Sequence, residues 1–117
     1  MTFGAHLYRL STMGKEFPRM TTQTLKVLVA FTTSQLDELS GAEIGKRTGL
    51  QSGTLYPILA RLEKVKWLQS KWEQGDPSEL GRPRRRLYQL TGLGVRSARS
   101  TYREISEMIG VPAWLHP

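Results

Sequence analysis

Residues 40–62, SGAEIGKRTGLQSGTLYPILARL, decide the fold because they hold two helix signals separated by a short turn. Ser40 and Glu43 have the spacing of a capping box, in which each side chain accepts a hydrogen bond from the other residue's backbone N–H. Gly49 supplies the left-handed residue at which helices commonly end. Together these signals predict a helix over residues 41–48.

A second, longer helix is predicted over about 52–65, with Ser52 as its N-cap. Pro57 lies one turn into this helix, where few backbone hydrogen bonds are lost and Gly53 leaves room for the ring, so we expect a distorted start and no break. The apolar positions recur every three or four residues and define one face: Leu55, Ile58, Leu59, Leu62 and Val65. Two helices joined by a tight turn form a helix-turn-helix, whose second helix presents its first residues to the DNA major groove.

The start of this second helix contains no acidic residue, and its side chains can bond phosphates or base edges. The candidate DNA contacts on it are Gln51, Ser52, Thr54, Tyr56 and, further along, Arg61. The motif alone leaves open the alternative of a capped helical hairpin that has no role in DNA binding.

A β-hairpin is predicted to follow the second helix. Residues 67–74 and 84–90 alternate in the manner of strands, and residues 75–78 (GDPS) have the composition of a turn. Trp67 and Trp72 belong to the first strand, and both are expected in the core.

The densest positive charge in the sequence lies in this hairpin, where four arginines fall within five residues around Pro83: Arg82, Arg84, Arg85 and Arg86. Such a cluster suits phosphates and a narrow minor groove. The candidate DNA contacts in the hairpin are Lys71, Arg82, Arg84 and Arg85. The alternative is an edge strand that charge protects against pairing with other chains.

Two further segments precede the helix-turn-helix. Residues 22–33 predict a largely buried helix with Thr22 as its N-cap, because its apolar surface is broad. Before it, residues 1–20 form an arm that can be either a short amphipathic helix or a frayed terminus. The apolar residues that allow the helix are Phe3, Leu7 and Leu10.

The C-terminal segment, residues 92–117, is expected to form a dimer. Its apolar side chains follow the spacing of a two-stranded helical seam: Val95, Ala98, Tyr102, Ile105 and Ile109. The alternative is that this stripe packs on the helix's own domain. Gly110 and Pro112 are expected to end the helix.

Length and charge limit the classes of protein to which the chain can belong. The chain has 117 residues, enough for one domain, and 17 Lys and Arg against 10 Asp and Glu give a net charge of +7. A basic chain of this kind points to a polyanionic partner, most often nucleic acid. There is no cysteine, which excludes disulfides, thiolate zinc sites and a cysteine nucleophile.

No enzyme activity, cofactor, metal site or membrane contact is expected. His6 and His116 lack neighbours at ligand spacing, and no catalytic dyad or phosphate-binding glycine loop is present. No apolar run has membrane-spanning length, and the first residues do not have the pattern of a secretory signal, so we expect a cytoplasmic protein.

The residues singled out above resemble the PadR family of bacterial winged-helix transcriptional regulators. The likeness covers roughly residues 22–95 and rests on GTLYPILARLE (53–63), Trp72-Glu73, GRPRR (81–85), Tyr88, Leu90-Thr91 and Gly94. It implies a homodimer, usually a repressor, that binds an inverted-repeat operator. By position, Thr54 and Tyr56 become contacts in the major groove, and Arg82 and Arg84 become contacts of the wing near the minor groove.

The resemblance has departures and one further implication. Lys66 stands where the family commonly has glycine, and lysine disfavours a left-handed helix end, so the bend into the wing is expected to differ. A single helix after the wing resembles the family's smaller subgroup. Some members bind flat aromatic molecules against tryptophan, which makes Trp114 a candidate for lining an effector pocket or for sealing the edge of the domain.

The sequence therefore predicts a mainly α protein with a small β-hairpin, divided into an arm (1–20), a winged helix-turn-helix DNA-binding domain (21–91) and a C-terminal dimerisation helix and tail (92–117). The predicted function is sequence-specific regulation of transcription, with double-stranded DNA and a second copy of the chain as partners. The alternative is a winged-helix module that binds proteins and not DNA.

Overall fold

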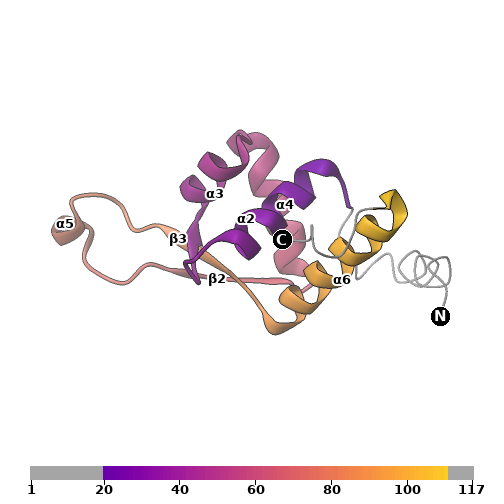
Figure 1. Cartoon of the computed structure of the whole chain (residues 1–117). Coiled ribbons are helices and arrows are strands. Elements are labelled where there is room, and N and C mark those ends of the chain that lie inside the picture. The colour runs from indigo at the N-terminus through magenta and orange to yellow at the C-terminus, as the bar shows by residue number, and fades with distance from the viewer. Residues whose placement is uncertain (1–19, 111–117) are drawn as a thin grey trace.

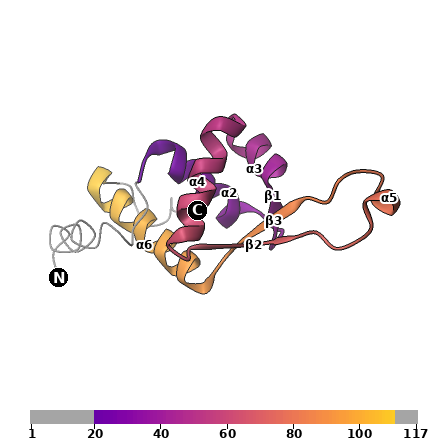
Figure 2. The ribbon, with the colours of Figure 1, turned by 180° about the vertical axis from the view of Figure 1, so that it is seen from behind.

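The computed structural model describes residues 20–110. A helical body carries a long β-hairpin, which projects away from it on the side opposite the last helix (Figures 1 and 2). The elements in chain order are α2 (Thr22–Thr33), β1 (Leu39–Ser40), α3 (Gly41–Thr48), α4 (Ser52–Lys64), β2 (Leu68–Trp72), α5 (Pro77–Leu80), β3 (Arg86–Leu90) and α6 (Gly92–Ile109). The predicted mainly α fold with a winged helix-turn-helix is confirmed. Residues 1–19 of the predicted arm (1–20) and Trp114 lie outside the described residues.

The helix-turn-helix forms as its capping signals predict. The Ser40 hydroxyl accepts a hydrogen bond from the Glu43 backbone at 3.2 Å, and the Glu43 carboxylate accepts one from the Ser40 backbone at 3.1 Å. Gly49 ends α3 with a φ of 75°, so the predicted bounds of this helix are confirmed. Helix α4 runs through Pro57 without interruption to Lys64.

Two predicted N-caps are wrong by one residue. Thr21, and not Thr22, caps α2, because its hydroxyl accepts the hydrogen bond from the Thr24 backbone at 3.2 Å. Gln51, and not Ser52, precedes α4, and it makes no capping bond through its side chain. A cap needs extended backbone geometry, and the sequence offered two adjacent polar residues at each place.

The hairpin belongs to a three-stranded antiparallel sheet with the order β1-β3-β2. The short strand β1 was not predicted; Leu39 pairs with Tyr88 in β3. In β2, Ser70 pairs with Tyr88 and Trp72 with Arg86. The one-turn helix α5 begins within the predicted turn (75–78) and extends past it, and its N-terminus is capped by the Asp76 carboxylate.

The two strand tryptophans have opposite environments. Trp67 is buried as predicted, whereas Trp72 is 59% exposed, so its assignment to the core was wrong. The outer end of β2 runs beyond the helices, and the Arg86 guanidinium lies over the Trp72 ring, 5.4 Å from the ring centroid. The core cluster lies nearer the body and comprises Val27, Leu28, Phe31, Leu39, Ile44, Leu55, Ile58, Leu59, Leu62, Trp67, Leu68, Tyr88 and Ala98.

The turn from α4 into β2 closes in the left-handed form despite its lysine. Lys66 has a φ of 68° and is the one non-glycine residue of the described chain with a positive φ. Its N–H bonds the carbonyl of Glu63 at 3.0 Å, and the N–H of Trp67 bonds the carbonyl of Leu62 at 2.9 Å. This pair of bonds defines a Schellman motif. Lys66 therefore takes the conformation that glycine usually supplies at such a helix end.

Helix α6 packs on the winged domain along its first half. Thr91 caps it and also donates a hydrogen bond to the carbonyl of Lys66 at 2.6 Å. Ala98 is completely buried within the single chain, which corrects the expectation that it faces a partner. Tyr102 bonds Thr32 of α2 at 3.1 Å. Only the end of the predicted stripe is open, with Ile109 66% exposed.

Candidate nucleic-acid interface

The first turn of α4 is presented to solvent. Gln51, Ser52, Gly53 and Thr54 are all exposed, and the turn holds no acidic residue. The first backbone N–H groups of a helix have no partner within it and carry the positive end of the helix dipole. This end of α4 is therefore suited to an anion such as a DNA phosphate.

Tyr56 is oriented by a contact that the sequence did not reveal. Its side chain is 47% exposed. Its hydroxyl lies so close to Gly41 of α3 that an added Cβ there would collide with it. Gly41 thus makes room for the tyrosine ring between the two helices. The ring is held at the exposed surface, where it can meet a base or a sugar.

Arg61 extends the same side of α4. It lies seven residues, or about two turns, beyond Thr54, so both side chains project from one side of the helix, and both are exposed. Glu63, the acidic residue of α4, is engaged with the hairpin. Its carboxylate accepts a bond from Ser70 at 2.6 Å and lies 3.8 Å from the Arg86 guanidinium.

Lys71 does not lie with the other candidates. Side chains alternate along a strand, and Ser70 of β2 faces α4. Lys71 therefore projects from the opposite face of the sheet, where its ammonium lies 3.0 Å from the carboxylate of Glu38.

The wing arginines divide into two groups. Arg84 and Arg85 have exposed side chains. Arg82 is held by Glu73, to which its two terminal nitrogens donate at 2.6 and 3.0 Å. These hydrogen bonds, with smaller effects of the nearby Arg85, lower the pKa of Glu73 to about 2. Neither the ion pair nor the role of Glu73 was anticipated, although Trp72-Glu73 stands in the sequence as part of the PadR resemblance.

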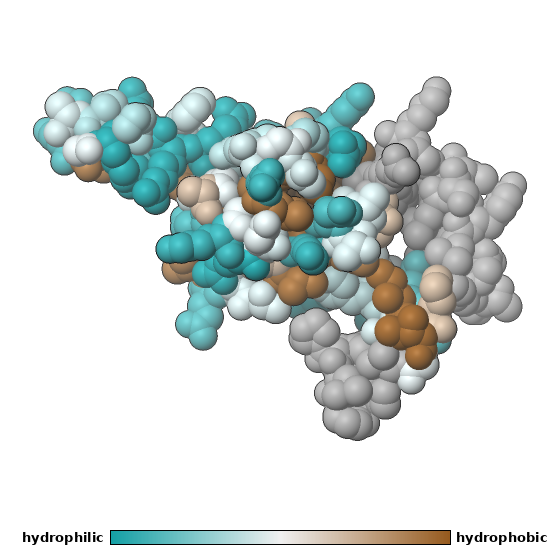
Figure 3. All heavy atoms as spheres, turned by 90° about the horizontal axis from the view of Figure 1, so that it is seen from above, coloured by the Kyte–Doolittle hydropathy of each residue, from teal (hydrophilic) through white to brown (hydrophobic). Residues whose placement is uncertain are grey.

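The distribution of polarity separates two ends of the molecule. Hydrophilic residues cover the projecting hairpin, and apolar residues gather toward the opposite end (Figure 3). At that end the last turn of α6 exposes Met108 and Ile109, at 60% and 66%. The polar end suits a polyanion, and the apolar end suits a protein surface.

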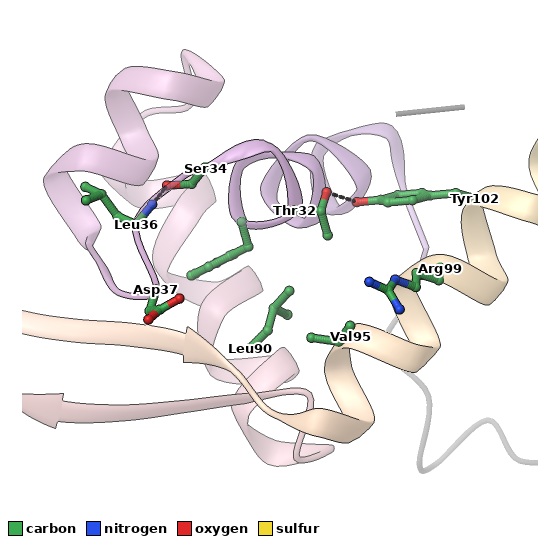
Figure 4. Close-up of a pocket in the computed structure, with 9 residues that line it drawn as sticks. Thr32, Ser34, Leu36, Asp37, Leu90, Val95, Arg99 and Tyr102 are labelled. Atoms are coloured by element: carbon green, nitrogen blue, oxygen red, sulfur yellow. Dashed lines mark hydrogen bonds between the residues drawn. The ribbon is translucent and has the colours of Figure 1, made fainter. Parts of the chain in front are cut away.

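A cavity of about 330 Å³ lies between α2, the loop that follows it and α6 (Figure 4). Its lining residues are Phe31, Thr32, Ser34, Leu36, Asp37, Leu90, Val95, Arg99 and Tyr102. Arg99 and Tyr102 reach from α6 toward α2, and burial raises the pKa of the Tyr102 phenol. The cavity was not predicted, because its walls come from segments that are distant in the sequence.

Solved structures with a similar fold include a transcriptional regulator and two complexes with DNA. PcaV from Streptomyces coelicolor has a TM-score of 0.66 and 23% identity over 95% of this chain and 80% of its own. Reduced AbfR bound to DNA has a TM-score of 0.63 and 24% identity over 86% of this chain and 63% of its own. The S. aureus MepR–DNA complex has a TM-score of 0.61 and 19% identity over 90% and 80%. A comparison with curated protein sequences finds no match.

These likenesses, each at 24% identity or less, define the class by its fold, that of the winged helix-turn-helix proteins. A family profile described as the transcriptional regulator PadR-like family matches residues 33–100. Since this is more than half of the sequence, the chain belongs to that family, as the sequence resemblance indicated. In the described part of the chain, no helix combines the length and the apolar character that crossing a membrane requires.

Proposed function

We propose that the chain is a sequence-specific transcriptional repressor that binds an inverted-repeat operator as a homodimer. Helix α4 would enter the major groove, and the wing would lie at the adjacent minor groove or backbone. The observation that carries the proposal is the exposed, acid-free start of α4, with the cationic wing projecting from the same body.

The proposed contacts divide into positioning and reading groups. The backbone at Ser52 and the guanidinium groups of Arg84 and Arg85 would hold phosphates, which fixes the register without reading sequence. The side chains that would read bases are Gln51, Thr54, Tyr56 and Arg61. Lys71 is left out, because it projects from the other face of the sheet toward Glu38.

The proposed dimer would use the outer half of α6. Ile105 is half-buried and Ile109 exposed, so their apolar side chains can contribute to a partner surface. The inner part of the stripe, Val95, Ala98 and Tyr102, would fix α6 on the DNA-binding domain and so set the distance between two recognition helices. We retain 21–91 as the DNA-binding domain and 92–117 as the dimerisation segment.

Selection from random-sequence duplexes, followed by fluorescence anisotropy at several salt concentrations, tests this function. We expect enrichment of an inverted repeat and a log–log salt slope of about −0.9 for each phosphate neutralised. Arg84→Ala should weaken binding to all duplexes and make the slope shallower, whereas Tyr56→Ala should also change which sequences are enriched. Lys71→Ala is the matched control, since it removes the same charge from the other face.

Three outcomes would each overturn the proposal or one of its parts. A chain that binds no duplex even at low salt would favour the alternative of a protein-binding winged helix. A chain that binds DNA but stays monomeric in analytical ultracentrifugation would contradict the proposed homodimer and the inverted-repeat operator. Equal losses of DNA affinity in Arg84→Ala and Lys71→Ala would contradict the assignment of the wing arginines as DNA contacts.

We also propose that a small aromatic acid binds in the cavity between α2 and α6 and changes DNA affinity. Phe31 and Tyr102 supply aromatic walls, the Arg99 guanidinium supplies a partner for a carboxylate, and Thr32 supplies a hydroxyl (Figure 4). A solved structure of Bordetella bronchiseptica BpsR, 20% identical over 93% of this chain, concerns regulation of its DNA binding by 6-hydroxynicotinic acid.

Titration with 4-hydroxybenzoate, read by calorimetry and by release of labelled DNA, tests the effector site. Binding should be lost in Arg99→Gln and kept in Arg103→Gln, because Arg103 is exposed one turn further along α6 and does not line the cavity. Binding that survives Arg99→Gln would place the effector elsewhere, for example at Trp114.

A further inference from the structure

Glu73 lies at the neck of the wing, where the loop 73–85 leaves the two strands, and it is hydrogen-bonded there to Arg82 and Arg85. Its carboxylate accepts hydrogen bonds from both terminal nitrogens of Arg82, at 2.6 and 3.0 Å, and from the backbone N–H of Arg85 at 3.3 Å. Its own N–H bonds the carbonyl of Arg85 at 2.8 Å. The first and last residues of the loop 73–85 are thereby tied to each other and to Arg82.

The loop beyond this neck has its own small structure. Asp76 caps α5, and Gly81 turns the chain back with a φ of 72°. The Leu80 side chain lies against Gly75, where an added Cβ would touch it at 3.4 Å. Apart from the contact of Leu80 with Gly75, these interactions are hydrogen bonds between residues close in sequence, so the doubly hydrogen-bonded ion pair is the strongest constraint on the shape of the loop.

Arg82 and Glu73 contribute little net charge toward DNA. Each neutralises the other, and the Arg82 guanidinium also donates to the carbonyl of Pro83 at 3.3 Å. The Glu73 carboxylate, with its pKa lowered to about 2 by the hydrogen bonds from Arg82, is ionised throughout the neutral pH range. Among the arginines of the wing, Arg84 and Arg85 are exposed and form no ion pair with a described residue.

We propose that Glu73 and Arg82 are positioning residues of the wing: their ion pair closes the loop and fixes Arg84 and Arg85 for contact with a DNA backbone, without touching DNA itself. The inference rests on the proposed DNA-binding function and deepens it. A loop ordered before binding loses less conformational freedom when it docks, so the ion pair raises affinity although it adds no contact.

The direction in which one substitution changes DNA affinity distinguishes a positioning role from a simple effect of charge. Glu73→Gln removes a negative charge, so electrostatics alone would tighten DNA binding. If the ion pair positions the wing, the same substitution weakens DNA binding by about threefold to tenfold. The reason is that the neutral amide has one acceptor oxygen and cannot accept both hydrogen bonds from Arg82. Glu79→Gln is the matched control, since Glu79 is exposed in α5 of the same loop and lies outside the ion pair.

Anisotropy titrations with the duplex enriched by the wild-type chain provide the measurement. Arg82→Gln should weaken binding and leave the salt slope unchanged. The double variant Glu73→Gln/Arg82→Gln keeps the wild-type net charge and should bind no more weakly than the single variants, because each already breaks the same interaction. Glu79→Gln should bind as tightly as wild type or more tightly.

A second readout needs no DNA. Limited trypsin digestion of the free chain should cut after Arg84 and Arg85 faster in Glu73→Gln than in Glu79→Gln, because the loop opens more often. Tighter DNA binding by Glu73→Gln, a shallower salt slope in Arg82→Gln, or equal digestion rates would each overturn the proposal. If the wild-type chain binds no duplex, the proposed function fails, and the digestion rates still decide whether the ion pair closes the wing.

Discussion

Replacing Lys66 by glycine should stabilise the protein. Lys66 occupies the left-handed position of the Schellman motif that turns the chain from α4 into β2, with a φ of 68°. A side chain in this conformation brings its Cβ close to the following carbonyl, whereas glycine adopts it without strain. The backbone bonds of the turn are formed by the N–H groups of Lys66 and Trp67, and glycine keeps both.

The expected gain is the difference of two opposing effects. Relief of left-handed strain contributes about 1–2 kcal/mol. The greater freedom of glycine in the unfolded chain offsets about 0.4–1 kcal/mol of this gain. The net increase in unfolding free energy is therefore about 0.5–1 kcal/mol, which corresponds to a rise in Tm of about 2–8 °C for a domain of this size.

Urea unfolding at a fixed protein concentration measures the effect, since dimer formation would make stability depend on concentration. Lys66→Ala is the proper reference, because it removes the charge near the end of α4 and retains the strain. Lys64→Gly is the opposing control: it places glycine within the helix and should cost about 0.5–1 kcal/mol. The reasoning is refuted if Lys66→Gly is no more stable than Lys66→Ala.

Three further predictions concern close packing and titration. Gly94→Ala should destabilise the fold by about 1–3 kcal/mol in urea unfolding, because the new Cβ would collide with the Trp67 carbonyl, whereas Gly92→Ala should not. Gly41→Ala should displace Tyr56 and change the enriched DNA sequences as Tyr56→Ala does; Gly45→Ala, whose added Cβ would lie at ordinary van der Waals distances from its neighbours, should leave them unchanged. Burial raises the pKa values of Tyr88 and Tyr102 above 10.0. Their stabilising contribution is complete below pH 10.0 and is lost as pH rises through the raised values, so spectrophotometric titration should show both ionising late.

Local signals predicted most of the helical framework. The capping box at Ser40 and Glu43 and the left-handed Gly49 involve residues at most a few positions apart, so their chemistry can be identified along the chain. The apolar spacing of α4 likewise predicted its buried face. The errors at this level, Thr22 and Ser52, moved each cap by one residue, because adjacent polar residues compete for the same role.

The candidate DNA interface was predicted in composition and only partly in geometry. The sequence identified the acid-free start of α4 and the arginine cluster of the wing. It could not separate Lys71 from the other cations, because a residue's face on a strand depends on what packs against that strand. It also did not distinguish Arg84 and Arg85, which are exposed, from Arg82, which is bound by a carboxylate nine residues earlier.

The sequence by itself determined which segments form the longer helices, where most of these helices end, and that the chain is basic enough to bind a polyanion, since these properties depend on neighbouring residues and on total charge. The tertiary structure alone decided that Trp72 is exposed, that Ala98 is buried, that Lys66 takes a left-handed conformation and that Glu73 holds Arg82. Each of these outcomes depends on groups that only folding brings together. Burial and ion pairing are properties of distances in space, and the order of residues does not specify those distances one pair at a time.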